Sequence, residues 1–163
     1  YFDQDRNESY IPYVVETSIG ADRMFLAMLS NNLIEENVPD AKGEDSTRTV
    51  FKIHPALAPI KCAVLPLVKN KDELTSLARS IYNDLHWKFK CQYDDKDAIG
   101  RRYRRQDAIG TPYCITVDFQ SIEDGTVTIR DRDSLHQERV SIAELTGMIS
   151  EKTSLSKLLQ QLV

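Results

Sequence analysis

Residues 99–119 read IGRRYRRQDAIGTPYCITVDF, and this stretch joins two kinds of regular structure. Its first part, GRRYRRQDAI, predicts a short basic helix. The part that follows, YCITVDF, predicts a strand, because Ile115, Val117 and Phe119 alternate toward one face. Such a succession of helix and strand favours an α/β fold.

Upstream of this stretch, the apolar residues Cys62–Leu65 predict a buried strand that ends near Pro66, since proline cannot donate a hydrogen bond inside a sheet. A helix should follow, because Asn70 and Glu73 resemble a capping box and apolar residues recur at steps of three and four. These apolar residues are Leu74, Leu77, Ala78, Ile81 and Leu85. Residues 87–93, WKFKCQY, then alternate as a strand.

Downstream, the segments TVTIRDRD (126–133) and QERVSI (137–142) predict a hairpin, and residues 142–163 predict a terminal helix. The resulting order is β-α-β-α-β-β-β-α. Strands joined by helices favour a parallel or mixed sheet with right-handed crossovers. We therefore expect residues 46–163 to form an α/β domain with a mixed, roughly five-stranded sheet flanked by helices.

The first 45 residues predict a separate strand and helix. Residues 13–15 favour a strand, and a helix is expected over 21–36 because its apolar residues lie on one side. These are Met24, Phe25, Met28, Leu29 and Leu33. The stretch Pro39–Thr47 has no apolar periodicity and predicts a linker or surface loop. A domain boundary is therefore placed between 1–45 and 46–163.

The composition is that of a soluble globular domain: 163 residues, of which 41% are hydrophobic and 28% charged. This length excludes two full enzyme domains. The sequence has no apolar run of membrane-spanning length and no signal-peptide layout, so we expect a cytoplasmic protein without a membrane partner. Cys62, Cys91 and Cys114 form no CxxC pair and are expected to be buried free thiols.

Charge is unevenly distributed along the chain. Residues 1–45 carry three basic and ten acidic groups (net −7), residues 46–110 thirteen and seven (net +6), and residues 111–163 five and eight (net −3). The middle block is where a polyanionic partner would bind. On charge alone, solubilising lysines and arginines on helix surfaces are the favoured explanation.

The basic helix places four arginines around one tyrosine. Arg101, Arg104 and Arg105 share a helical face, while Arg102 points elsewhere. Like charges this close repel one another, and Asp97 offers only partial relief, so the cluster indicates an external anion. Arginines of this kind hold phosphates or bases. Solvated arginines on an exposed helix are the alternative.

A second candidate feature is Phe119 at a strand end near Arg130 and Arg132, where an aromatic ring beside arginines could hold an unstacked base. The residues alone favour the alternative that Phe119 continues the core face of its strand. Neighbouring carboxylates that could simply neutralise the arginines are Asp118, Asp131 and Asp133.

The histidines and nucleophiles do not form a catalytic pattern. His54, His86 and His136 share no metal-ligand spacing with one another or with the cysteines, and no HExxH, GxSxG or Walker-type loop is present. We therefore expect no metal site and no self-contained enzyme.

Two segments resemble a known family. ETSIGADR, residues 16–23, resembles motif 3 of class II aminoacyl-tRNA synthetases. The run 99–119, followed by TVTIRDRD and preceded by FKIHPALAP at 51–59, resembles the C-terminal anticodon-binding domain of the dimeric type of glycyl-tRNA synthetase. The histidyl, prolyl and threonyl enzymes have similarly folded domains. The resemblance covers nearly the whole chain.

The motif 3 resemblance implies that Arg23 binds ATP and that Glu16 and Ser18 help to hold the glycine substrate. Thr17 stands where many relatives have proline. Motifs 1 and 2 have no counterpart in this sequence, so the resemblance implies only the last strand and helix of a catalytic domain, and no complete catalytic site. ATP, with Mg²⁺, would serve the parent enzyme, and no cofactor is expected for this part alone.

The anticodon-domain resemblance implies that Arg101, Phe119 and Arg132 contact the anticodon. It shifts the interpretation of Phe119 from a core residue toward a base-contacting one. Arg104 and Arg105 become candidates for the tRNA backbone, since phosphate contacts position a nucleic acid and base contacts specify it.

The family resemblance implies a homodimeric parent enzyme that activates glycine with ATP and transfers it to tRNA(Gly). The present chain would bind the anticodon region and would not be catalytic alone. One alternative is a paralogue acting as an accessory subunit of a mitochondrial DNA polymerase, against which the complete ETSIGADR motif argues. The other is a plain interaction domain with solvated arginines.

Overall fold

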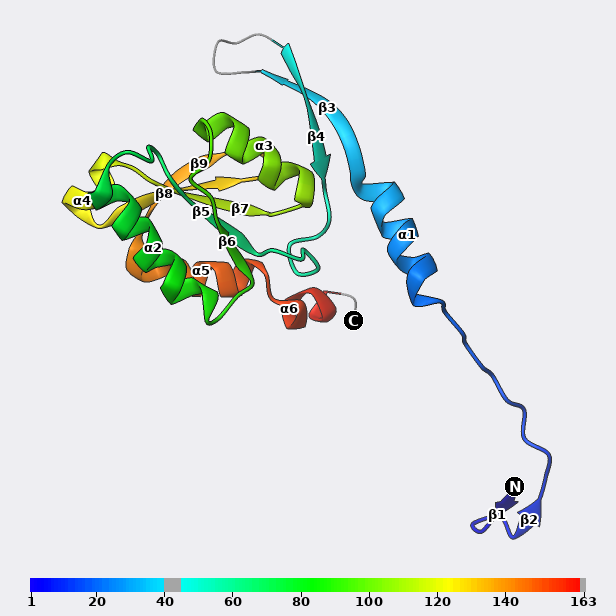
Figure 1. Ribbon diagram of the computed structural model, residues 1–163. Helices are drawn as coiled ribbons and strands as arrows, with labels where there is room; N and C mark the ends of the chain where they lie inside the picture. The colour runs from blue at the N-terminus through cyan, green and yellow to red at the C-terminus, as the bar shows by residue number, and fades with distance from the viewer. Residues whose placement is uncertain (40–44, 162–163) are drawn as a thin grey trace.

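The computed structural model describes residues 1–39 and 45–161 of the chain (Figure 1). Most of these residues form one α/β unit, and the N-terminal segment extends away from it as a long arm (Figure 1). In chain order the elements are β1 (Phe2–Asp3), β2 (Glu8–Ser9), α1 (Ala21–Asn32), β3 (Leu33–Pro39), β4 (Asp45–Phe51), β5 (Cys62–Pro66), α2 (Asp72–His86), β6 (Cys91–Tyr93), α3 (Ile99–Ile109), β7 (Tyr113–Val117), α4 (Phe119–Asp124), β8 (Thr126–Asp131), β9 (Gln137–Ser141), the 3₁₀ turn η1 (Ile142–Glu144), α5 (Leu145–Lys152) and α6 (Leu155–Gln160).

Five strands form one mixed sheet in the order β6-β5-β7-β8-β9. Strand β5 pairs in parallel with both β6 and β7, whereas β8 runs antiparallel to β7 and β9 antiparallel to β8. Helices α2 and α3 make the parallel pairs possible, because each returns the chain to the start of the next strand. The predicted mixed five-stranded sheet and the predicted hairpin are confirmed.

Helices cover both faces of the sheet. On one face, side chains of α2 and α5 pack against Val64 and Ile115 of the central strands. On the other face, Ile99 and Tyr103 of α3 pack against Ala63, Leu65 and Cys114. Every residue of β5 and β7 is buried as a result. This two-sided burial explains why Cys62–Leu65 is a continuous apolar run.

Helix α2 and strand β6 differ in detail from the prediction. The N-cap of α2 is Lys71 and makes no side-chain cap hydrogen bond, so the predicted capping box of Asn70 and Glu73 does not form. Strand β6 begins only at Cys91, because the residues before it close the end of α2, with the Phe89 amide donating to the Leu85 carbonyl at 2.9 Å.

The predicted terminal helix is divided into η1, α5 and α6. Helix α5 ends at Lys152, and Ser154 starts a new helix by accepting a hydrogen bond from the Lys157 amide at 3.2 Å. A serine at this position favours an N-cap over a continuing helix, since its hydroxyl binds the free amides of the next turn. Residues 162–163 lie outside the described residues.

Strands β3 and β4 form an antiparallel hairpin where a longer helix and a linker were predicted. Helix α1 ends at Asn32, and Leu33 opens β3, which pairs with β4 over seven registered residue pairs. The β-branched residues of β4 favour this pairing. The pairing outweighs the helical spacing of apolar residues that predicted a helix up to residue 36. The middle of the predicted linker, 40–44, lies outside the described residues.

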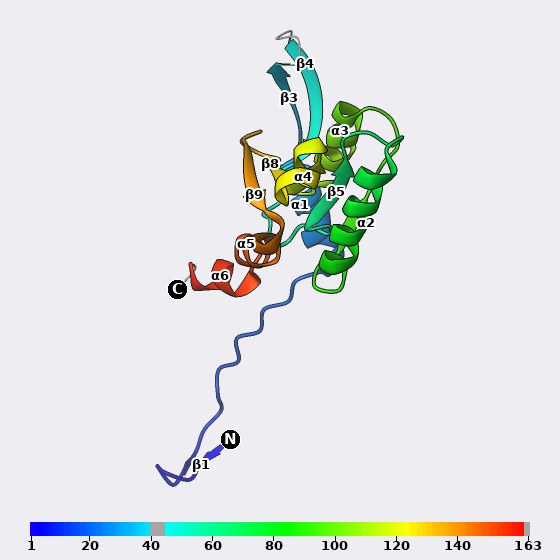
Figure 2. The same cartoon turned by 90° about the vertical axis from the view of Figure 1, so that its left-hand side faces the viewer.

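The hairpin lies mainly against α3. In both views β4 runs beside α3 at the edge of the α/β unit (Figures 1 and 2). Only the last part of α1 packs on the unit, where Met28 and Leu29 contact Phe51, Ile53 and Ala58. A division between residues 45 and 46 would therefore cut through a continuous hairpin.

Candidate nucleic-acid interface

The parallel strands place two of the predicted anticodon residues at one edge of the sheet. Helix α3 begins after the carboxyl end of β6, and α4 begins directly after the carboxyl end of β7. Arg101 lies in the first turn of α3 and Phe119 in the first turn of α4. The carboxyl ends of parallel strands are where open α/β sheets bind their ligands. Arg101 and Phe119 thus both lie at the carboxyl edge of the sheet, where a ligand is most expected.

Phe119 is the first residue of α4, and its side chain is not part of the core. Strand β7 ends at Val117, and Phe119 is 50% exposed. The interpretation of Phe119 as a continuation of the core face is therefore wrong, because the strand ends two residues before it. An exposed aromatic ring at the start of a helix is available for stacking on a base.

Asp118 fixes the backbone that presents Phe119. Its carboxylate accepts hydrogen bonds from the Ser121 amide at 3.0 Å and from two nitrogens of Arg139 at 2.7 Å each. The hydrogen bonds from Arg139, joined by those from Ser121, overcome the effect of burial and lower the pKa of Asp118 to about 2. The sequence predicts that the Asp118 carboxylate neutralises a neighbouring arginine. The arginine with which it pairs is Arg139.

The arginines of α3 differ widely in exposure. The Arg101 side chain is 79% exposed, and its one ion pair, with Asp97, is long at 4.0 Å. Arg102 is 2% exposed and donates to the Asp97 carbonyl at 3.0 Å and to the carbonyl of Pro66. The prediction that Arg102 points away from the shared face is confirmed. Its role is to bind carbonyl groups at the carboxyl edge of the sheet.

Arg104 and Arg105 are both engaged within the chain. Arg105 donates to the carboxylates of Asp94 at 2.8 Å and Asp97 at 2.7 Å. These hydrogen bonds raise the pKa of Arg105, and the bond from Arg105 lowers the pKa of Asp97. Arg104 donates to the Thr47 carbonyl at 2.8 Å. The expectation of only partial acidic relief is therefore wrong for Arg105, because Asp94, in the same β6–α3 loop as Asp97, also pairs with it.

Shallow clefts flank Arg105 on both sides of α3. One, of about 520 Å³, lies between α3 and β6 and includes Tyr93 and Gln106. The other, of about 340 Å³, lies between α3 and β4 and includes Thr47 and Arg104. The basic face of α3 is thus bordered by concave surface on each side.

Arg132 lies at the opposite edge of the sheet from Phe119. Tyr113, the first residue of β7, pairs with Asp131, whereas Phe119 follows the last residue of β7. The five residues of β7 span about 13 Å at ~3.3 Å per residue. Two of the three predicted anticodon residues, Arg101 and Phe119, therefore lie at the carboxyl edge of the sheet, and the third does not.

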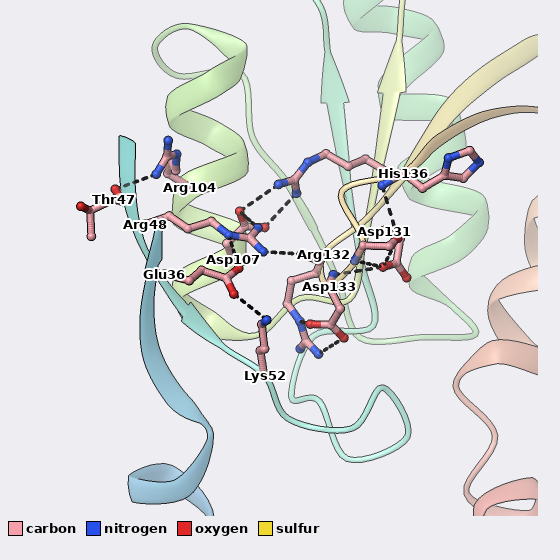
Figure 3. A network of polar contacts seen from close by, with 12 residues as sticks. Glu36, Thr47, Arg48, Lys52, Arg104, Asp107, Asp131, Arg132, Asp133 and His136 are labelled. Atoms are coloured by element: carbon pink, nitrogen blue, oxygen red, sulfur yellow. Dashed lines mark hydrogen bonds and ion pairs between the residues drawn. The ribbon is translucent and has the colours of Figure 1, made fainter. Parts of the chain in front are cut away.

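The guanidinium of Arg132 is buried and bonded. It is 1% exposed and donates to the carbonyls of Gly110 at 2.9 Å and Ile53 at 2.8 Å. It also donates to the carboxylate of Asp133 at 2.7 Å (Figure 3). These bonds join the strand end to the loops that precede β5 and β7. In this conformation Arg132 has no surface to offer a base, and an anticodon contact by this residue stays a prediction.

A buried ionic network that the sequence did not reveal holds α3 in place (Figure 3). Arg48 of β4 donates to Asp107 of α3 at 2.9 Å, and Arg130 of β8 donates to both oxygens of the same carboxylate at 2.8 and 3.0 Å. Arg130 also lies 4.7 Å above the ring of Tyr103. Asp107 follows a run of arginines in the sequence, so the neighbouring residues do not indicate that its side chain is buried.

Glu36 supplies a second carboxylate to this network. Its oxygens accept hydrogen bonds from Arg48 at 2.7 Å and from Lys52 at 2.6 Å. Burial raises the pKa of Glu36, but the hydrogen bonds and charges of Lys52 and Arg48 outweigh it and lower the pKa overall. Glu36 thus holds β3 to Arg48 and Lys52, while Arg48 joins the hairpin to Asp107 of α3.

The motif 3 residues lie on the arm. Glu16 and Ser18 are exposed in a segment without regular structure, and Arg23 is exposed in the first turn of α1. The strand predicted at 13–15 is absent, since no described strand pairs with this segment. The structure therefore gathers Glu16, Ser18 and Arg23 on one exposed segment without forming a pocket from them.

Two further kinds of feature are absent from residues 1–39 and 45–161. No group of three or more histidine, cysteine, aspartate or glutamate side chains has the arrangement of a metal site there. None of the helices in the same residues has the length and apolar character needed to cross a bilayer.

Comparison with known proteins finds relatives that match nearly the whole chain. The chain is 48% identical over 152 residues to a protein of Thermobifida fusca, 50% over 151 residues to one of Clostridium perfringens and 51% over 153 residues to one of Staphylococcus aureus, each named glycine–tRNA ligase. These matches cover 93–94% of this chain but only 32–33% of each relative. The chain thus spans about a third of the length of the relatives that it matches.

A solved structure shows the same fold. The RNA binding domain of threonyl-tRNA synthetase from Cryptosporidium parvum superimposes with a TM-score of 0.56 at 22% identity, covering 62% of this chain and 25% of the other. Residues 61–152 match the family described as the anticodon binding domain. They include the whole of the five-stranded sheet and the helices α2 to α5. The chain therefore belongs to the anticodon binding domain family.

Proposed function

We propose that this chain is the C-terminal part of a glycine–tRNA ligase and that it binds the anticodon region of tRNA(Gly). The main support is the identity of about 50% to glycine–tRNA ligases along nearly the whole chain. The same relatives do not favour an accessory subunit of another enzyme. The exposed pair Arg101 and Phe119 at the carboxyl edge of the sheet supplies the chemistry for binding.

Arg101 and Phe119 would make the first contacts with the anticodon loop. A flexible, exposed guanidinium can bind a phosphate or a base edge, and an exposed phenyl ring can stack on an unpaired base. Arg104 and Arg105 would follow the tRNA backbone beside α3. Arg132 would reach a base only after releasing the carbonyls of Gly110 and Ile53, so we assign it second place among the anticodon contacts.

The parent enzyme would activate glycine with ATP and Mg²⁺ in the cytoplasm and would act as a homodimer. Glu16 and Ser18 would bind glycine, and Arg23 would bind ATP, once the arm pairs with upstream residues of the catalytic domain. We place the end of that domain before the β3–β4 hairpin, because the buried ion pairs of Arg48 attach the hairpin to α3.

Competition for binding tests the proposed function directly. The purified chain is titrated with labelled tRNA(Gly), and unlabelled tRNA(Gly) competes against the same tRNA with an altered anticodon. We expect the native anticodon to compete more strongly, because base stacking contributes about 1–3 kcal/mol per base. Equal competition by both tRNAs would leave only a general basic surface, and the absence of any binding would contradict the proposal.

A further inference from the structure

Two of the three cysteines are direct neighbours in the sheet. Cys62 of β5 and Cys91 of β6 are register partners in the parallel pair. Both side chains belong to the apolar cluster beneath α2. Cys114 packs on the opposite face of the sheet, with Ala63 and Leu65. All three thiols are free.

The spacing of the two neighbours is compatible with a disulfide. Hydrogen-bonded strands lie about 4.8 Å apart, and disulfides join residues whose Cα atoms are roughly 4.4–6.8 Å apart. The Cβ atoms must approach slightly more closely than in an undisturbed ladder. Strand β6 allows this movement, because it has three residues and forms the outer edge of the sheet.

The two thiols differ in reactivity. Cys62 is fully buried, whereas Cys91 is partly exposed on the edge strand. The hydrogen bond that Cys91 accepts from Cys62 lowers the pKa of Cys91 and, together with burial, raises the pKa of Cys62. When protonated, the Cys91 thiol donates to the Phe89 carbonyl at 3.3 Å. A partly exposed thiol of lowered pKa beside a second thiol is the arrangement found at sites of reversible oxidation.

We propose that Cys62 and Cys91 form an oxidation site, at which hydrogen peroxide converts the two thiols into a disulfide between β5 and β6. The Cys91 thiolate attacks one peroxide oxygen, and the O–O bond breaks to give a sulfenic acid and hydroxide. The Cys62 sulfur then attacks the Cys91 sulfur, the S–O bond breaks, and water leaves. In total the two sulfurs lose two electrons, and one peroxide becomes two molecules of water.

Peptide mapping of the unmodified chain tests the proposal. The protein is treated with hydrogen peroxide, alkylated under denaturing conditions and digested with trypsin, which separates the Cys62 peptide (62–69) from the Cys91 peptide (91–96). We expect these two peptides to be linked and the Cys114 peptide to be alkylated. Dithiothreitol should restore all three thiols. Three alkylated thiols after treatment, or a link to Cys114, would overturn the proposal.

Three variants separate the steps. Cys91→Ser should abolish the link and leave Cys62 reduced, while Cys114→Ala should form the link as fully as the original chain. Cys62→Ala should stop the reaction at the sulfenic acid, which a dimedone label detects at residue 91. Thermal melting confirms that each variant is folded before oxidation. Loss of the link in Cys114→Ala, or no dimedone label in a folded Cys62→Ala protein, would contradict the proposed order of steps.

Discussion

Arg48 on β4 and Asp107 on α3 form an ion pair of 2.9 Å between side chains that are 1% and 0% exposed. They are 59 residues apart in the sequence. The same carboxylate accepts two hydrogen bonds from Arg130, so one aspartate joins the hairpin, the basic helix and the sheet. The position of the arginine face of α3 therefore depends on a residue that itself faces inward.

Asp107→Asn should destabilise the fold strongly. Removing one member of a buried ionic group leaves unpaired charge, at a cost of about 3–5 kcal/mol. Arg48 would then keep its hydrogen bond to Glu36, whereas Arg130 would lose the carboxylate to which it donates two hydrogen bonds. Urea unfolding measures the loss. Asp97→Asn is the control, since this exposed carboxylate also pairs with an α3 arginine but should leave the unfolding midpoint nearly unchanged. Equal midpoints for the two variants would contradict the structural role of Asp107.

Gly110→Ala should cost more than Gly125→Ala. Both glycines have positive φ, +84° and +66°, so each alanine carries the strain of the left-handed region, about 1–2 kcal/mol. A Cβ at Gly110 would also lie 2.8 Å from a ring carbon of Phe51, whereas a Cβ at Gly125 meets nothing within 4 Å. Denaturant unfolding of both variants compares the two costs. A loss at Gly125 as large as that at Gly110 would show that backbone strain alone decides.

The Asp118–Arg139 pair should make stability depend on pH in the acid range. The folded pKa of Asp118 is about 2, below its ordinary 3.8, so its contribution is present above about pH 4 and is lost as the pH falls toward 2. After solvent screening the contribution is about 1–2 kcal/mol. Asp118→Asn lacks it. The difference in unfolding free energy between the two proteins should disappear near pH 2, and a constant difference at all pH values would argue against the assignment.

Arg101→Ala and Arg102→Ala should have opposite effects on binding and stability. Arg101→Ala should weaken tRNA binding and reduce the salt slope by about one unit, because a phosphate contact releases a counterion. Its melting temperature should not change, since the side chain is 79% exposed. Arg102→Ala should instead lower stability by about 3 kcal/mol, because buried carbonyls lose a charged donor. Titrations at several salt concentrations, paired with melting curves, distinguish the two.

Phe119→Ala should reduce anticodon discrimination without unfolding the protein. Loss of one stacked base costs about 1–3 kcal/mol against the native anticodon and much less against an altered one. The matched control is Ile122→Ala, since Ile122 lies on the same helix and is 43% exposed against 50% for Phe119. Competition binding with both tRNAs gives the discrimination of each variant. If Ile122→Ala loses as much discrimination as Phe119→Ala, the aromatic ring has no special role.

The local sequence by itself determined the main elements. The apolar run Cys62–Leu65, the helical spacing from Leu74 to Leu85 and the segment 99–117 all form the predicted structures. These signals suffice because burial on two faces, or on one helical face, fixes which neighbouring residues must be apolar. The same local spacing correctly separated Arg102 from Arg101 on α3.

Tertiary structure alone decided which charged residues are available for binding. Arg101 and Arg132 look alike in the sequence, but one is exposed and the other is buried against two carbonyls. Partners from distant segments cause this difference. Arg48 pairs with Asp107, which is 59 residues away in the sequence. Residues 33–36 form a strand and not a helix, because they pair with β4. An arginine is buried only where carbonyls and carboxylates meet its donors, and long-range pairing brings those acceptors together.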